Sequence, residues 1–194
     1  MERFSNTTAI GVRMTLDYEA ISYFHQQFGN VADAARPDAN STRGYPEFLQ
    51  MFWQEVGFGS RKDGFVWLVN PQESSWLVPM FDLDRSLIPF ARTSFGDFHL
   101  FDPGGHFFFF SPNHKALMLI AESFYTAIMT LSEAEYIEDD VLFARHQKMW
   151  EEGNRINATT CFCLNPAIAL GGDELTSEIY VGDLQTYCHL LSQA

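Results

Sequence analysis

The chain has 194 residues, 46% of them hydrophobic, which is enough apolar material for one large domain or two small ones with an ordinary core. Its 25 acidic and 12 basic residues give a formal charge of −13, and repulsion from phosphate argues against direct binding to nucleic acid or to an anionic membrane. The N-terminal residues include no apolar stretch long enough for a secretion signal, so we expect a protein that acts in the cytoplasm, where it is made.

Two helices are expected before the first strand. Apolar residues recur at helical spacing from Asp17 to Phe28, and Gly29 follows as a stop signal. The segment Val31–Gly44 is rich in small and polar side chains and predicts a surface loop. From Tyr45 to Val56 the apolar residues again form one stripe, and Gly57 lies just beyond its end.

Beyond Gly57 the pattern changes to short runs of residues that favour strands. Turn signals separate most of these runs, which indicates an antiparallel meander. The expected strands are Gly64–Asn70, Leu87–Thr93, Gly96–Asp102, Gly105–Ser111 and Ala116–Ala121.

One of these runs contains four consecutive phenylalanines, Phe107 to Phe110. A helix that crosses a bilayer needs about 20 apolar residues, so this run is too short to be a membrane anchor. In a strand, Phe107 and Phe109 point to one face and Phe108 and Phe110 to the other. We therefore expect a central strand covered on both faces, with partial exposure at a partner interface as the alternative.

Helical patterns return after the strands. Ser123 is placed to cap a helix from Phe124 to Leu131, and a further helix is expected from Asp139 or Asp140 to about Glu152. From Val181 to Gln193 apolar residues recur at helical spacing. The expected fold is α+β, an antiparallel meander sheet with N-terminal and C-terminal helices packed on it.

No strong catalytic motif is present, because the chain has no glycine-rich phosphate loop, nucleophile elbow or paired-histidine zinc helix. The best enzymatic candidate is the group His99, His106 and His114 with Asp97 and Asp102, which neighbouring strands could bring together around a metal. Histidines that flank turns or face solvent explain the same group. We expect no catalytic residue, metal or cofactor, with a small metal-dependent hydrolase that uses the His99, His106 and Asp102 region as an alternative.

The remaining reactive side chains are interpreted as structural. Cys161 and Cys163 alternate with Phe162 as strand residues do, and they lack the two-residue gap of redox and zinc motifs. The odd number of cysteines fits a reduced cytoplasm. His146 falls in a helical segment and is interpreted as a surface or boundary residue.

Several acidic residues are candidates for binding a partner. Those close together before the helix at residue 140 fit either a solvated helix start or an electronegative patch that faces a basic surface. Weaker candidates lie in two other segments. The full set is Glu133, Glu135, Glu138, Asp139 and Asp140, then Asp82 and Asp84, then Asp173 and Glu174.

Three blocks of the sequence resemble a known bacterial pair of modules, over most of the chain from about Leu16. Residues Pro46–Pro71 resemble a GAD-like domain, with a helix ending in Trp, then Gly-Phe-Gly, then Asp-Gly-Phe-x-Trp-Leu-Val-Asn-Pro. Residues Ile88–Asp102 and Asn165–Gln193 resemble the C-terminal domain of type VI secretion immunity proteins that neutralise DNase toxins. The positions that carry the likeness are Trp53, Gly57, Gly59, Gly64, Trp67, Asn70, Pro71, Gly96, Asp97, Asp102, Ala169, Leu170, Gly171 and Gly172.

The resemblance implies a cytoplasmic immunity protein, without catalysis of its own, that binds a cognate nuclease effector and blocks it. It implies a GAD-like region at 1–85 and an immunity-type region at 86–194, in one compact unit. An acidic inhibitor can occupy the basic groove in which a nuclease binds phosphates, although solubility alone also explains the charge. A regulatory scaffold of the cell-wall-regulator type is a further alternative.

Overall fold

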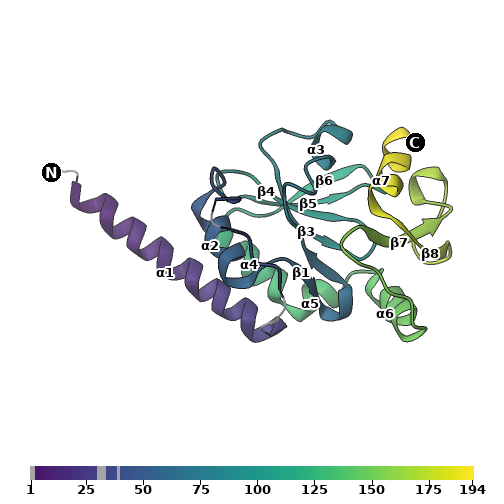
Figure 1. The fold of residues 1–194 in the computed structure, drawn as a ribbon, viewed down its shortest axis with the longest axis horizontal. Helices are drawn as coiled ribbons and strands as arrows, with labels where there is room; N and C mark the ends of the chain where they lie inside the picture. Colours follow the sequence, from purple (N-terminus) through teal and green to yellow (C-terminus); the bar gives the residue numbers. More distant parts are fainter. Residues whose placement is uncertain (1–2, 30–33, 39) are drawn as a thin grey trace.

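The computed structural model describes residues 3–29, 34–38 and 40–194. At its centre is a six-stranded antiparallel sheet in which every strand pairs with the next one along the chain (Figure 1). Its strands are β1 (Gly59–Arg61), β2 (Val66–Leu68), β3 (Ile88–Thr93), β4 (Phe98–Phe101), β5 (Phe107–Ser111) and β6 (Ala116–Ala121). The predicted meander is therefore confirmed, with the short β1 as an additional strand. A separate two-stranded sheet pairs β7 (Thr160–Asn165) with β8 (Glu178–Asp183).

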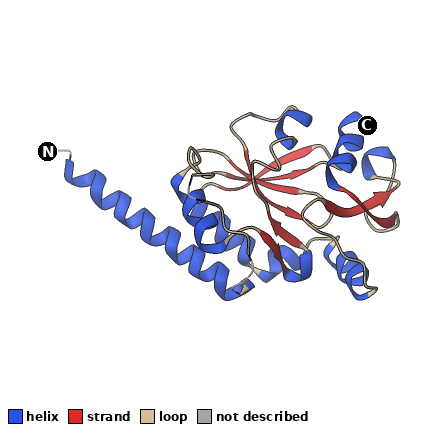
Figure 2. Cartoon of the chain, viewed as in Figure 1, coloured by secondary structure: helices blue, strands red, loops and turns tan. Residues whose placement is uncertain are grey.

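Helices flank the central sheet, so the fold class is α+β as predicted (Figure 2). The helices before β3 are α1 (Arg3–Phe28), α2 (Glu47–Val56) and the short α3 (Leu77–Met80). Those after β6 are α4 (Phe124–Ser132), α5 (Ala134–Glu138), α6 (Phe143–Glu151) and α7 (Leu184–Gln193). Two single 3-10 turns, η1 (Lys62–Gly64) and η2 (Ile168–Leu170), complete the elements.

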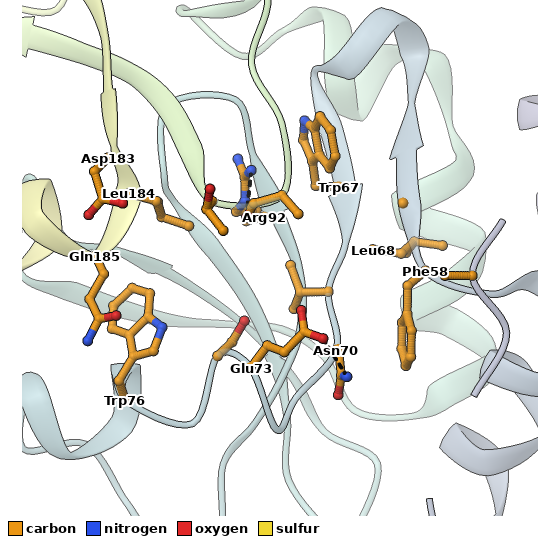
Figure 3. A pocket seen from close by; sticks show the side chains of 16 residues that line it. Phe58, Trp67, Leu68, Asn70, Glu73, Trp76, Arg92, Asp183, Leu184 and Gln185 are labelled. Carbon is orange, nitrogen blue, oxygen red and sulfur yellow. Dashed lines mark hydrogen bonds between the residues drawn. The ribbon is translucent and has the colours of Figure 1, made fainter. Parts of the chain in front are cut away.

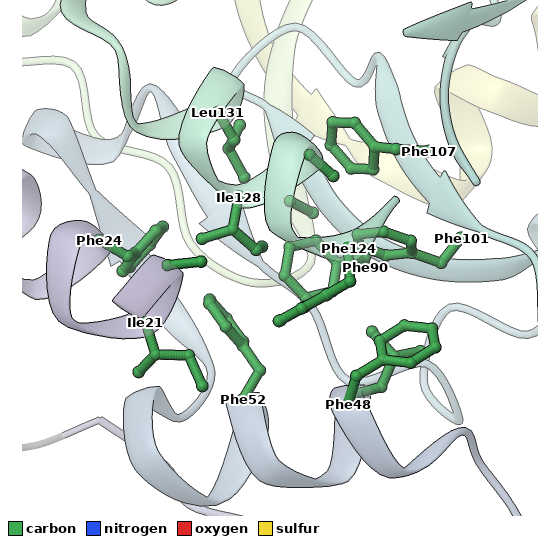
Figure 4. Close-up of a cluster of buried hydrophobic side chains, with 14 of the residues drawn as sticks. Ile21, Phe24, Phe48, Phe52, Phe90, Phe101, Phe107, Phe124, Ile128 and Leu131 are labelled. Carbon is green, nitrogen blue, oxygen red and sulfur yellow. The ribbon is translucent and has the colours of Figure 1, made fainter. Parts of the chain in front are cut away.

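On one face of the sheet, phenylalanines from three helices meet phenylalanines from the strands (Figure 4). The ring centroid of Phe52 in α2 lies 5.2 Å from that of Phe24 in α1 and 4.9 Å from that of Phe90 in β3. Phe124 of α4 lies 5.7 Å from Phe101 of β4. Because each such ring buries roughly 150–250 Å², this aromatic layer is the main attachment of α1, α2 and α4 to the sheet.

The opposite face is covered by α3, α7 and the β7–β8 sheet. Phe98 and Leu100 of β4 pack there with Phe110 of β5, against Cys161 of β7 and Tyr187 of α7. All of these residues are buried. The cysteine side chains therefore act as small core residues, as their alternation in the sequence indicated.

The phenylalanine run in β5 is covered on both faces. β5 lies between β4 and β6, one strand in from the edge of the sheet. Phe107 is buried against the helices, Phe110 is buried in the second layer, and Phe108 and Phe109 are half-buried. The prediction of packing on both faces is confirmed for Phe107 and Phe110, whereas Phe108 and Phe109 are partly exposed next to the edge strand β6.

Some helix boundaries differ from those expected. α1 begins at Arg3 and not at Asp17, and its first half projects beyond the sheet (Figure 1). The apolar pattern in the sequence marks only the part of α1 that packs on the body of the protein, where Ala20 and Phe24 are fully buried. The apolar pattern therefore predicts a shorter helix than the structure has.

Side-chain hydrogen bonds lie at two other boundaries. α6 begins at Phe143, after a turn in which the Asp140 side chain accepts a hydrogen bond from the Leu142 backbone N–H at 2.8 Å. α7 begins at Leu184, since Asp183 ends β8 and its side chain accepts from the Thr186 N–H at 2.8 Å. The segment from Val181 to Asp183, expected to be helical, is the end of a strand.

The expected loop Val31–Gly44 lies partly outside the described residues, which exclude 31–33 and 39. Its described part includes a bridge between Ala35 and Phe58, with the Phe58 N–H donating to the Ala35 carbonyl at 2.9 Å. The predicted boundary between residues 85 and 86 falls between β2 and β3, which pair within one sheet. The division into two regions stays a prediction.

Candidate partner-binding surface

Five carboxyl groups gather around α5, and we call them the acidic cluster: Glu133, Glu135, Glu138, Asp139 and Asp140. All are exposed except Asp140, which is half-buried. The α5 helix is held in place by its buried Ile137, which packs with Phe65 and Phe143. Because Ile137 faces the core, the acidic residues beside it in the sequence face solvent.

Three members of the acidic cluster have partners within the chain. Glu133 accepts a hydrogen bond from the Tyr23 hydroxyl at 2.8 Å, which ties α1 to the end of α4. Glu138 forms an ion pair with Lys62 at 3.0 Å. The third member, Asp140, accepts from the Leu142 backbone N–H in the turn before α6.

Glu135 and Asp139 are different, because their carboxylates make no hydrogen bond or ion pair within the described part of the chain. Both are exposed. A carboxylate with no internal partner keeps its full capacity to pair with a cationic group of another molecule. These two residues are thus the members of the acidic cluster that are most open to a partner.

The other acidic candidates mostly support local turns. Asp84 accepts from the Ser86 N–H at 2.8 Å, and this bond lowers the pKa of its carboxyl group. Asp173 accepts from the backbone N–H groups of the two residues that follow Glu174, which lowers its pKa likewise. Glu174 pairs with His114 at 2.7 Å. Asp82 is exposed in the turn after α3, with a left-handed φ of 51°.

The structure brings some of these candidates together and separates others. The pKa of Asp140 is raised by burial and, to a smaller extent, by the negative charge of Glu174, so these carboxyls are neighbours. Asp84 interacts instead with Asp102, at the far end of β4 from the acidic cluster. One partner surface can therefore contact the acidic cluster and Glu174 together more easily than it can contact all of the acidic candidates at once.

A cavity of about 330 Å³ opens beside the acidic cluster, between α5 and the sheet. Asp139 and Asp140 lie at its rim, and Phe109, Met118 and Tyr136 line its apolar part. His99 also lines it and is buried, with Nε2 3.0 Å from the Tyr136 hydroxyl. Burial lowers the pKa of His99 to about 3, so this imidazole is neutral at physiological pH.

A second cavity, of about 370 Å³, lies where β2 and β3 meet the start of α7 (Figure 3). Trp67, Trp76 and the buried Arg92 line it, together with Glu73 and Asp183. The Arg92 guanidinium donates to the backbone carbonyl oxygens of Asn157, just before β7, and Thr160, its first residue, and no carboxylate pairs with it within the described residues. Carbonyl dipoles thus balance the charge of Arg92. Through these hydrogen bonds the side chain links the central sheet to the β7–β8 sheet.

The alternative metal site does not assemble. His99 lies in the core next to Tyr136, whereas His106 pairs with Asp102 at 2.7 Å in the exposed turn after β4. Across the described residues, no group of three or more His, Cys, Asp and Glu side chains is close enough to hold a metal ion. His146 was expected at the surface and is buried, because it packs against Phe65 and Trp150.

Residues 21–108 match the GAD-like domain. The match runs from α1 into β5 and includes the residues Trp67 and Arg92 of the second cavity. It therefore extends past the predicted boundary at residue 85. In the part of the chain that the structure describes, no helix is both long and apolar enough to traverse a bilayer.

The fold is similar to that in the crystal structure of Atu4351 from Agrobacterium tumefaciens, with a TM-score of 0.71 at 16% sequence identity. The likeness covers 89% of this chain and 88% of that chain, so nearly the whole architecture is shared. At this identity the comparison shows a common fold. No curated protein matches the chain.

Proposed function

We propose that this protein is an immunity protein that binds a cognate nuclease effector of a type VI secretion system in the cytoplasm and neutralises it. The match of residues 21–108 to the GAD-like domain carries the proposal, because that domain is associated with immunity proteins. The likeness of Ile88–Asp102 and Asn165–Gln193 to the C-terminal domain of DNase-immunity proteins supports a nuclease as the partner.

The charge distribution supports binding through the acidic cluster. A nuclease presents cationic side chains where it holds the phosphates of its substrate, and an inhibitor with a net charge of −13 is attracted to such a surface. Glu135 and Asp139 carry the unpaired carboxylates that can replace phosphate groups there. Asp82, Asp84, Asp173 and Glu174 remain candidates for secondary contacts.

The rigidity of the acidic cluster supports tight binding. α5 is anchored by Ile137 in the core, and its ends are tied by the contacts Tyr23–Glu133 and Lys62–Glu138. A surface that is already ordered loses little conformational entropy on association. Most of the binding free energy can then appear as affinity.

Co-expression tests the function. A candidate nuclease effector from the producing strain is expressed in a susceptible host with and without the protein, and survival is counted. Survival only with the protein present supports the immunity function. Death in both cultures, together with failure of the purified protein to bind the nuclease, would overturn it.

Charge reversal tests the surface separately. Glu135→Lys with Asp139→Lys should slow association with the nuclease about tenfold at low salt and reduce the salt dependence of the rate. Glu55→Lys with Glu178→Lys is the matched control, since it changes the charge equally at exposed positions outside the acidic cluster. Equal association rates for both variants would place the contact elsewhere and leave the immunity function standing.

A further inference from the structure

The last strand of the central sheet, β6, has no neighbour on its outer side within the described residues. Its sequence, Ala-Leu-Met-Leu-Ile-Ala, contains no charged or polar side chain. Leu117, Met118 and Leu119 are 41%, 48% and 52% exposed. An uncharged edge strand with unpaired N–H and C=O groups is a template on which another strand can pair.

The opposite edge of the sheet is protected. β1 has only three residues, and Phe58, just before it, is bridged by Ala35. Short edge strands and covering segments are the usual means of preventing edge-to-edge pairing. β6 is twice as long as β1, and within it only a bulge at Ile120, near its end, interrupts the regular pairing with β5. The segment Ala116–Leu119 is regular and open.

We propose that two copies of this chain associate through β6, which pairs antiparallel with β6 of the second copy to make one continuous twelve-stranded sheet from two sheets of six. The two-fold axis of such a dimer is perpendicular to the sheet, so each residue faces one that points to the same side. An axis at Met118 satisfies this condition. It sets Met118 opposite Met118 of the second copy and Leu117 opposite Leu119.

The residues at the two ends of β6 are complementary in charge. Lys115 precedes the strand, Glu122 follows it, and both are exposed. With the axis at Met118, Lys115 of each copy lies opposite Ala121 of the other, next to its Glu122, so the two oppositely charged ends are neighbours twice in one dimer. The segment is thus self-complementary, apolar in the middle and oppositely charged at its ends, and this selects a second copy as the occupant.

Apolar burial has to outweigh the mutual repulsion of two acidic chains. At physiological ionic strength charges are screened over roughly 8 Å, which limits the repulsion between carboxylates that are not in direct contact. Leu117, Met118 and Leu119 are removed from water in both copies at once. We therefore expect a dimer of the free protein, independent of the effector.

Disulfide cross-linking of the purified protein, without effector, tests the register. Facing residues in antiparallel strands have Cα atoms about 4.5–5.5 Å apart, a separation that a disulfide spans. Met118→Cys should therefore form a covalent dimer on mild oxidation, because the native cysteines are all buried. Leu190→Cys, at a similarly exposed site on α7, is the control and should stay uncross-linked.

Charge exchange tests the pairing independently, with dissociation measured by sedimentation. Lys115→Glu alone or Glu122→Lys alone should raise the dimer dissociation constant about tenfold, since both end contacts become repulsive. The double variant should restore wild-type association. A protein that is monomeric at every concentration overturns the proposal, and so does a dimer that Met118→Lys leaves intact. A monomer that loses effector capture on Met118→Lys would likewise overturn self-pairing and identify the edge as an effector site.

Discussion

The guanidinium of Arg92 lies over the ring of Trp67, with its Cζ 5.0 Å from the ring centroid. Its Nη2 donates to the carbonyl oxygens of Asn157 and Thr160, at 2.7 and 3.0 Å. Arg92 is fully buried, and burial lowers its pKa to about 10, so it stays charged at neutral pH. One side chain of the central sheet thus holds the segment that leads into β7.

Replacing Arg92 by leucine should destabilise the protein by about 3 kcal/mol or more, because each buried carbonyl that loses its donor costs about 1–3 kcal/mol. Urea unfolding measures the change. Arg85→Leu is the control, since Arg85 is exposed and its loss should change stability by less than about 0.5 kcal/mol. Similar midpoints for both variants would contradict a structural role for Arg92.

Because β5 packs on both of its faces, we expect similar losses of stability when a buried ring is removed from either face. Phe107→Ala removes a buried ring from the helix face, and Phe110→Ala removes one from the second layer. Each should lower the free energy of unfolding by about 3–5 kcal/mol, through lost burial and the cavity left behind. Leu119→Ala, on the exposed edge, should cost far less in dilute protein. A small loss for Phe110→Ala would mean that the second layer does not cover it.

Gly172 should not tolerate a side chain. A Cβ at this position would lie 1.9 Å from the carbonyl oxygen of Pro166, and that backbone cannot move away cheaply. Gly172→Ala is therefore expected to destabilise the loop between β7 and β8 and to lower the thermal midpoint. Gly171→Ala is the neighbouring control, because it meets no atom within 4 Å and bears only the strain of a φ of 88°, about 1 kcal/mol. Equal midpoints would contradict the close approach.

Two buried histidines should make the protein less stable in acid. Burial lowers the pKa of His99 to about 3 and that of His146 to about 4, both below the 6.5 of a free imidazole. Between these values and pH 6.5 the unfolded chain binds the additional protons, so stability falls as the pH drops. The stability that comes from keeping these two imidazoles neutral is fully present above pH about 6.5.

Asp97 acts in the opposite direction. Burial raises its pKa from 3.8 to about 6, so between these two values the folded chain holds a proton that the unfolded chain has released. Unfolding in urea at about pH 7 and about pH 5 separates the two effects. His146→Gln should reduce the loss of stability on acidification, and Asp97→Asn should increase it. If the difference in stability between the two pH values is the same in both variants as in the wild type, other groups control the response to acid.

The strand pattern of the central sheet was readable in the sequence because it rests on local features. The strands β2 to β6 are apolar runs, with Gly96 in the turn before β4, Gly104 in the turn before β5 and Pro112 in the turn before β6. In β4 the side chains alternate, with Phe98 and Leu100 on one face and Phe101 on the other. The short β1 and α3 carry too few residues to show a period. β8 was not recognised, since its pattern merges with the helical spacing of α7.

The sequence by itself determined the acidic charge, the α+β class and the two-sided burial of the phenylalanine run, because composition and short-range periodicity are properties of neighbouring residues. Only the tertiary structure decided which carboxylates are free. Tyr23 and Lys62 reach the acidic cluster from positions 110 and 76 residues away, and such pairings leave no periodic trace in the chain. The burial of His146 and the exposure of β6 were decided in the same way, by which segments pack beside them.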